Sequence, residues 1–245
     1  MRTDEKRFYM GESVKRGYVP NDSKAFNEEA LQVLRNAGED LYYLLNRHYK
    51  IKGASTLIGN HYTLSERQRL ALVRAVSPET DLEMRKEKEC LELIEEVNID
   101  GFNTIITLEV ALSGSLLVRG MDGTIRDLAG LRGTYRIIDK TYLAVKYLFE
   151  ALEEKGIKKA HIFLDAPVSN SGRLKQLLLE KAEGYQVSVE VEVINEVDSV
   201  LSVKKGVISS DAIILNKCES WVNLNAYIIE KKLPMSWCID FCSKP

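Results

Sequence analysis

Short runs rich in β-branched residues alternate with helical stretches in the second half of the chain. The runs cover residues 97–100, 160–165, 187–194 and 206–210, and the clearest helical stretches cover residues 141–155, 171–182 and 197–204. This alternation is typical of βαβ units, in which right-handed crossovers join parallel strands. We therefore expect an α/β domain over residues 91–245, with a mainly parallel sheet flanked by helices.

The first half of the chain has a helical rhythm instead. Apolar residues recur at helical spacing, Ser65 offers an N-cap, and Pro78 stops the helix that Ser65 begins. Residues 1–20 are expected to be an extended, poorly ordered lead-in. Because no strand pattern is present, we expect an all-helical domain over residues 1–90. Its helices are predicted over residues 26–48, 54–61, 65–77 and 81–93.

The composition excludes several classes of protein. With a formal net charge of −2, contact with a polyanion would need a local patch or a bound metal. The chain has no run of about 18 apolar residues and no secretory signal, and its four cysteines fit reduced thiols. These features predict a cytoplasmic protein without a membrane partner. Cys238 and Cys242 could form a metal or redox pair, but no histidine lies nearby and the CxxC spacing is absent.

An aspartate follows each of the four predicted strands, and the carboxyl ends of parallel strands share one edge of a sheet. These residues are Asp100, Asp165, Asp198 and Asp211. One such aspartate is readily explained as the cap of the next helix. Four together would repel one another, and a hard cation would hold them ionised. Ligands that are all oxygens favour Mg²⁺ or Mn²⁺ over zinc, so we expect a metal site of these four aspartates.

The order of these acids resembles the PIN/NYN-like nuclease superfamily. Ile99-Asp100-Gly101-Phe102-Asn103 is similar to its first-strand signature, Val197-Asp198-Ser199 to its late acidic helix start, and Ser209-Ser210-Asp211 to its final strand end. Asp165 would match the middle acid of the NYN branch. The likeness covers about residues 95–220. It implies a PIN-like fold and a Mg²⁺- or Mn²⁺-dependent ribonuclease.

The whole chain also resembles a two-domain family known as domain of unknown function 434 for its helical half. The residues that carry this resemblance are 21–23, 40–47, 59–62, Arg67, Arg69 and Arg74 in the first half, and 122–130 and 165–173 in the second. This resemblance implies no activity. Residues 113–136 are an insertion-like stretch that the nuclease families generally lack in this form.

That stretch is rich in glycine and arginine. Arg126, Arg132 and Arg136 present bidentate donors suited to phosphate, and Tyr135 could stack on an unpaired base. The stretch would then form the substrate-facing wall of the site, with Asp127 beside it. An ordinary surface hairpin, in which the arginines pair with neighbouring aspartates, explains the pattern equally well.

A loop rich in serine and asparagine follows Asp165 and leads into a predicted helix. Ser169, Asn170, Ser171 and Arg173 could bind a phosphate at the helix N-terminus, or the loop could be a plain N-cap. Neither the P-loop spacing nor a GxGxxG pattern before a helix is present, which argues against a nucleotide cofactor.

Five arginines of the helical half could form a further phosphate-contacting face. They are Arg35, Arg47, Arg67, Arg69 and Arg74. However, residues 1–90 hold 16 Lys and Arg against 14 Asp and Glu, a surplus of two, and a solvated helix face explains this as well.

These patterns lead to the hypothesis of a metal-dependent nuclease acting on RNA. The four aspartates would hold Mg²⁺ or Mn²⁺, Asn103 would orient Asp100 or a bound water, and the arginines would neutralise phosphates. The helical domain would dock the substrate, a protein partner or a second copy of the chain. The alternative is a non-catalytic RNA- or protein-binding adaptor whose acids only cap helices. A phosphatase acting on a small substrate would share the metal chemistry.

Overall fold

The computed structural model describes residues 14–90, 94–130 and 133–242. Its first part is helical as predicted, and no described strand lies before residue 94. Ser65 forms a capping box with Gln68 at the start of α4, and Pro78 directly precedes α5. The helices are α1 Asp22–Ala25, α2 Glu28–Asn46, α3 Ile51–His61, α4 Glu66–Ala75 and α5 Glu79–Lys88. The last three predicted residues of α5, 91–93, lie outside the described residues.

The second part contains the expected parallel sheet. Its four strands are β1 Glu96–Asp100, β4 Lys159–Asp165, β5 Ser188–Ile194 and β6 Val207–Ile208. They are ordered β5-β4-β1-β6, and all three pairings are parallel. The chain builds outward from β1 to β5 and then returns to the other side of β1. The strand order therefore reverses between β1 and β6, where open α/β sheets usually bind ligands.

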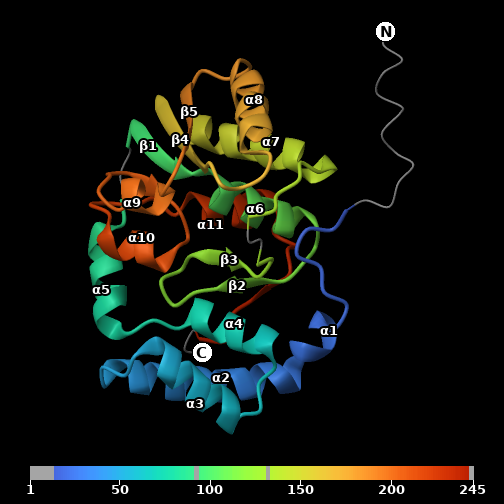
Figure 1. Cartoon of the computed structure of the whole chain (residues 1–245), viewed down its shortest axis with the longest axis vertical. Coiled ribbons are helices and arrows are strands. Elements are labelled where there is room, and N and C mark those ends of the chain that lie inside the picture. Colours follow the sequence, from blue (N-terminus) through green and yellow to red (C-terminus); the bar gives the residue numbers. More distant parts are fainter. Residues whose placement is uncertain (1–13, 91–93, 131–132, 243–245) are drawn as a thin grey trace.

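Helices cover both faces of this sheet (Figure 1). They are α6 Gly101–Leu112, α7 Asp139–Glu154, α8 Ser171–Ala182, α9 Val197–Leu201, α10 Ala212–Lys217 and α11 Leu224–Lys232. The larger hydrophobic core combines β1 and β4 with α6, α7, α8 and α11. A smaller core on the sheet joins α9 and α10 through Phe163, Leu201 and Trp221. Among the described helices, none is long and apolar enough to cross a membrane.

The insertion-like stretch forms a hairpin, as the alternative interpretation predicted, but this hairpin is buried and does not lie on the surface. Its strands β2 Leu117–Arg119 and β3 Ile125–Asp127 pair antiparallel, and β7 Cys238–Ile239 joins β2 to complete a second sheet. This sheet lies between α6 and the helical part (Figure 1). Leu116, Val118 and Phe241 pack into one core with α2, α3 and α4. The helical part and the hairpin therefore share a hydrophobic core.

Residues 14–20 were expected to belong to an extended, poorly ordered lead-in. Instead, Arg16 anchors them to the α/β part. Arg16 is buried, and its Nε donates to Glu109 Oε2 on α6 at 2.8 Å. The Arg16 backbone amide also donates to Ser113 Oγ at 2.9 Å. A buried carboxylate on α6 needs a cation, and the segment before α1 supplies it. Residues 1–13 lie outside the described residues.

Candidate functional site

The four predicted aspartates lie at the carboxyl edge of the parallel sheet. Asp100 ends β1, Asp165 ends β4, Asp198 lies in the first turn of α9 after β5, and Asp211 follows β6. Asp100 and Asp211 therefore flank the point where the strand order reverses. The sheet topology brings together residues that are more than a hundred positions apart in sequence.

Asp100 is the buried member of this group, with only 6% of its surface exposed. The pKa of Asp100 is raised to about 7, mainly by burial and also by the charges of Asp165 and Asp198, although hydrogen bonds from Ser209 and Asn103 oppose the shift. Ser209 Oγ donates to Asp100 Oδ2 at 2.9 Å, and the Asn103 amide donates to Asp100 Oδ1 at 3.2 Å. These two donors orient the carboxylate without supplying a positive charge.

The other acids act on each other in the same way. Burial and then the charge of Asp198 raise the pKa of Asp165, although the Val197 backbone amide opposes the shift. Burial and then the charge of Asp211 raise the pKa of Asp198, and Lys217 opposes this shift. The four carboxylates therefore lie within electrostatic reach of one another, in a chain from Asp100 to Asp211.

Within the described ranges, none of these four aspartates forms an ion pair with a lysine, arginine or histidine. In the same ranges, no group of three or more His, Cys, Asp or Glu side chains is placed to hold a metal ion as it stands. The structure therefore brings the four acids to one edge, but it does not gather three of them around a single point.

Two of the four aspartates are also helix caps, as the alternative interpretation predicted for each. Asp100 caps α6, and Asp211 Oδ1 accepts from the amides of Ile213 at 2.7 Å and Ile214 at 3.3 Å. The cap uses only one oxygen of Asp211, which leaves Oδ2 for another partner. Capping therefore accounts for part of the pattern and does not exclude a second role.

Gly101 lets α6 begin directly against β4. A Cβ at this position would lie 2.6 Å from Leu164 Cδ2 and 2.9 Å from the Phe163 carbonyl oxygen. Any larger residue would push α6, and with it Asp100 and Asn103, away from the sheet.

Asn103 contacts Asp100 as predicted, but through its backbone amide and not through its side chain. Its side-chain oxygen accepts from the Ser210 amide at 2.9 Å and from Ser210 Oγ at 3.0 Å. Asn103 thus ties the start of α6 to the end of β6 and reaches Asp100 only through its backbone amide. Ser209 and Ser210 complete this link, and sequence reasoning gave them no role. Their position next to Asp211 was the available signal.

Three of the predicted substrate-binding residues line one cavity of about 450 Å³. Arg136, Ser169 and Asn170 lie in its wall with Arg16, Thr134 and Tyr135. Ser169 Oγ accepts from the Tyr135 amide at 2.8 Å, and Asn170 Nδ2 donates to the Tyr135 carbonyl at 2.6 Å. Asn170 is the N-cap residue of α8, but its side chain makes no cap hydrogen bond and contacts Tyr135 instead. The loop that starts at Asp165 is therefore fastened to residues 134–136.

The remaining predicted residues differ in accessibility. Arg173 and Arg136 are exposed, whereas Ser171 is buried. Tyr135 is fully buried, and its hydroxyl contacts Glu109 Oε1 at 2.8 Å, so it cannot stack on a base. Arg132 lies outside the described residues.

The prediction that Arg126 binds a substrate phosphate is wrong, because its guanidinium group is buried and its donors are in use. Nε donates to the Ser210 carbonyl at 2.7 Å, Nη1 to the Arg74 carbonyl at 2.6 Å, and Nη2 to Asp122 Oδ2 at 2.5 Å. Arg126 is instead a structural link between the hairpin and the end of β6.

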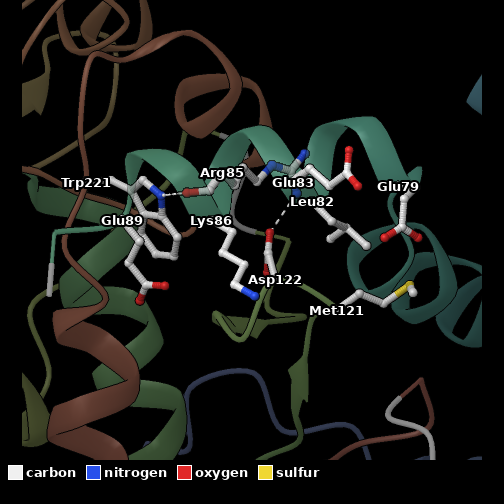
Figure 2. A pocket seen from close by; sticks show the side chains of 9 residues that line it. All are labelled: Glu79, Leu82, Glu83, Arg85, Lys86, Glu89, Met121, Asp122 and Trp221. Atoms are coloured by element: carbon white, nitrogen blue, oxygen red, sulfur yellow. Dashed lines mark hydrogen bonds and ion pairs between the residues drawn. The ribbon is translucent and has the colours of Figure 1, made fainter.

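A second cavity, of about 410 Å³, lies between α5 and the turn of the hairpin (Figure 2), and none of the four acids is in its lining. Trp221, Met121 and Leu82 form its apolar wall, and Lys86 extends into it. Beneath it, the buried Arg85 donates to Asp122 Oδ2 at 2.6 Å. Asp122 therefore pairs with both Arg85 and Arg126.

The raised pKa of Asp100 gives a prediction for stability. Because the folded-state pKa of about 7 exceeds the ordinary value of 3.8, the stability associated with the protonated form is lost as the pH rises towards 7. This difference corresponds to at most about 4 kcal/mol. Asparagine mimics the protonated form but has one oxygen for two donors, so we expect Asp100→Asn to raise the free energy of unfolding by about 2 kcal/mol at pH 8.

Urea unfolding in EDTA, at pH 8 and near pH 4, measures this effect. The gain should be present at pH 8 and nearly absent at the lower pH. A variant that is less stable than the parent chain at pH 8 would show that the carboxylate of Asp100 carries no uncompensated charge.

Comparison with known proteins gives two family matches. Residues 92–227 match the family described as Domain of unknown function (DUF5616), and residues 33–88 match the one described as Protein of unknown function (DUF434). The predicted resemblance to the second family is thus confirmed for the helical part, while the α/β part matches a family of its own. "Uncharacterized protein MJ0935" of Methanocaldococcus jannaschii is 34% identical over 187 residues, which cover 74% of this chain and 88% of that protein. No solved structure matches the chain.

Proposed function

This chain belongs to the family described as Domain of unknown function (DUF5616), with a helical part of the DUF434 type, so we infer its activity from its candidate site alone. We propose that it is a metal-dependent ribonuclease. The observation that carries the proposal is the group of four aspartates at the carboxyl edge of the sheet, two of them beside the strand-order reversal. No cationic side chain is paired to any of them among the described residues. Ionised carboxylates in such a site lower the stability of the folded chain when no counter-charge is present, as the raised pKa of Asp100 indicates.

The chemistry of the donors fits a hard divalent cation. Asp100, Asp165, Asp198 and Asp211 offer only carboxylate oxygens, which suit Mg²⁺ or Mn²⁺. Asp100 would be the fixed ligand, since Ser209 and Asn103 hold it, and the other three would turn towards it when the cation binds. When bound, the cation would supply a water of lowered pKa and neutralise charge on a phosphodiester.

The side chains around the acids suit a polyanionic substrate. Lys217 is exposed and acts electrostatically on Asp198, so it lies where it could offset phosphate charge. The cavity beside the loop after Asp165 presents the exposed Arg136 with Ser169 and Asn170, and Arg173 is exposed in the first turn of α8. These groups would orient the phosphates on either side of the scissile bond.

The choice of RNA as substrate rests on the resemblance of the acid motifs to PIN/NYN-like nucleases. Asn103 and Ser210 would keep β1 and β6 in register, so that Asp100 and Asp211 remain on opposite sides of the reversal point. Asn103 and Ser210 would then be positioning residues that do not contact the substrate.

The test is cleavage of a labelled single-stranded RNA by the purified chain. We expect fragments with Mn²⁺ or Mg²⁺ and none when EDTA is present. DNA of the same sequence and p-nitrophenyl phosphate are assayed in parallel. Hydrolysis of the small ester alone would identify a phosphatase, and RNA binding without any cleavage would identify an adaptor.

A further inference from the structure

An exposed basic and aromatic surface lies where α2 passes into α3. We call it the α2–α3 corner and define it by Tyr43, Arg47, Tyr49, Lys50 and Lys52. All five residues are exposed, with 58% of Tyr43 and 57% of Tyr49 accessible. The corner therefore presents both aromatic rings and positive charge to solvent.

The charge of the α2–α3 corner is locally uncompensated. Residues 41–65 contain no aspartate or glutamate but include Arg47, Lys50 and Lys52. None of these three cations forms an ion pair with another side chain in the described part of the chain. The nearest acids in sequence on α2 are Glu39 and Asp40, and Asp40 accepts a hydrogen bond from Tyr62 at 2.8 Å.

Other arginines of the helical part are used inside the fold. Arg67 pairs with Asp22 at 2.8 Å, Arg69 binds the Leu64 carbonyl at 2.8 Å, and Arg74 contacts Asp127. They are therefore not the phosphate-contacting face that the sequence suggested. Arg47, by contrast, makes no ion pair among the described residues and lies at the α2–α3 corner.

Tyr49 follows the turn that ends α2. The amides of His48 and Tyr49 donate to the carbonyls of Leu45 at 2.9 Å and Leu44 at 3.1 Å, which ends α2 in a Schellman turn. His48 takes the left-handed conformation there, with φ of 64°, where glycine is usual. The residue after such a turn commonly packs back on the helix. Tyr49 is exposed instead, so its ring is free to contact a ligand.

Tyr43 and Arg47 form a second element of the corner. The Arg47 guanidinium lies 5.1 Å from the centre of the Tyr43 ring, one helical turn away. This cation–π contact places the guanidinium over the ring, and no hydrogen bond from its N–H groups is found among the described residues. A stacked arginine and tyrosine offer both a flat surface for a base and donors for a phosphate.

We propose that the α2–α3 corner binds single-stranded RNA, with Arg47, Lys50 and Lys52 on successive phosphates and Tyr49 stacked on a base. A single strand supplies the anions and flat apolar rings that this surface matches, and binding of this kind needs no sequence preference. The inference deepens the proposed function, on which the choice of RNA rests. The β2–β3 hairpin lies between α2 and α3 and the four-stranded sheet (Figure 1), so the corner would hold a segment of a long strand remote from the scissile bond.

The test is binding of labelled oligouridine to the full chain in EDTA, followed by fluorescence anisotropy at several salt concentrations. The variant Arg47→Gln/Lys50→Gln/Lys52→Gln should weaken binding of a strand of roughly 30 nucleotides by about tenfold or more. A strand of roughly 8 nucleotides is too short to contact both the corner and the acid site, so it should bind the parent chain without the added affinity of the longer strand. The slope of log K against log salt should fall by about 2, because each lost phosphate contact removes about 0.7. Tyr49→Ala should weaken binding about fivefold without changing the slope.

The matched control removes the same charge elsewhere, in Lys24→Gln/Lys86→Gln/Lys158→Gln, all at exposed positions. Equal loss in this control, or no loss in the corner variant, would overturn the proposal. Failure of the parent chain to bind RNA would also overturn the proposal. The same holds if the parent chain binds phosphatidylserine vesicles or an acidic protein, and the corner variant alone abolishes that binding. If RNA binding behaves as expected but no metal supports cleavage, the binding role of the corner is supported and the ribonuclease is rejected. If RNA is cleaved but the corner variant binds it unchanged, the ribonuclease is supported and the binding role of the corner is rejected.

Discussion

Replacing Asp100 or Asp165 with asparagine is expected to lower the rate of Mn²⁺-dependent RNA cleavage by about 100-fold or more. The amide keeps the size of the side chain but removes the charge that the cation and its water need. Asp100→Asn should also remain folded, since it removes a buried charge that has no counter-cation among the described side chains.

Glu183→Gln is the matched control for this pair of variants. Glu183 is exposed and ends α8, the helix that runs back from the carboxyl edge of the sheet, so its carboxyl group lies at the opposite edge. Its cleavage rate should equal that of the parent chain. Metal-dependent cleavage that persists in both aspartate variants would remove the mechanism.

Asp122→Ala is expected to lower the free energy of unfolding by about 3–5 kcal/mol, because it leaves two buried guanidinium groups without their shared carboxylate. Asp122 Oδ2 accepts from Arg85 at 2.6 Å and from Arg126 at 2.5 Å, and all three side chains are nearly inaccessible. Burial opposes a lower pKa of Asp122, but the charge and hydrogen bond of Arg126, the Thr124 hydrogen bond and the charge of Arg85 together lower it.

Urea unfolding at neutral pH measures the loss. The control is Glu230→Ala, which removes the exposed partner of Arg119 and should change the unfolding free energy by about 0.5 kcal/mol or less. A loss below about 1 kcal/mol for Asp122→Ala would mean that water reaches the two arginines and that the pair does not join α5 to the hairpin.

The sequence was sufficient to predict the elements that local patterns determine. Helix α8 has the predicted bounds, and the four parallel strands lie at the expected positions, because hydrophobic runs and caps act over a few residues. The shared edge of Asp100 and Asp211 followed from the direction of parallel strands. The two residues of β7 and the anchoring of Arg16 could not be predicted, since each depends on a partner more than ninety positions away.

The arginines show where local reasoning failed. Arg126 and Arg136 lie in the same glycine-rich stretch, yet Arg126 is buried on Asp122 and Arg136 is exposed. All three residues of β3 are buried, so the position of Arg126 is set by Asp122 and by packing of the hairpin, and a three-residue strand gives no signal of this. The unpaired Arg47 was grouped with Arg67 and Arg74 for the same reason, because pairing with Asp22 and Asp127 appears only in the fold.

Thermal unfolding with and without Mn²⁺ examines the convergence of the four aspartates most directly. A cation that binds only the folded chain stabilises it by mass action, by about 2.7 kcal/mol at one hundred times its Kd. We therefore expect a rise in Tm for the parent chain that saturates with Mn²⁺ and is absent in the Asp100→Asn/Asp165→Asn double variant. An unchanged Tm in the parent chain, or an equal rise in the double variant, would contradict a shared cation site at this edge of the sheet.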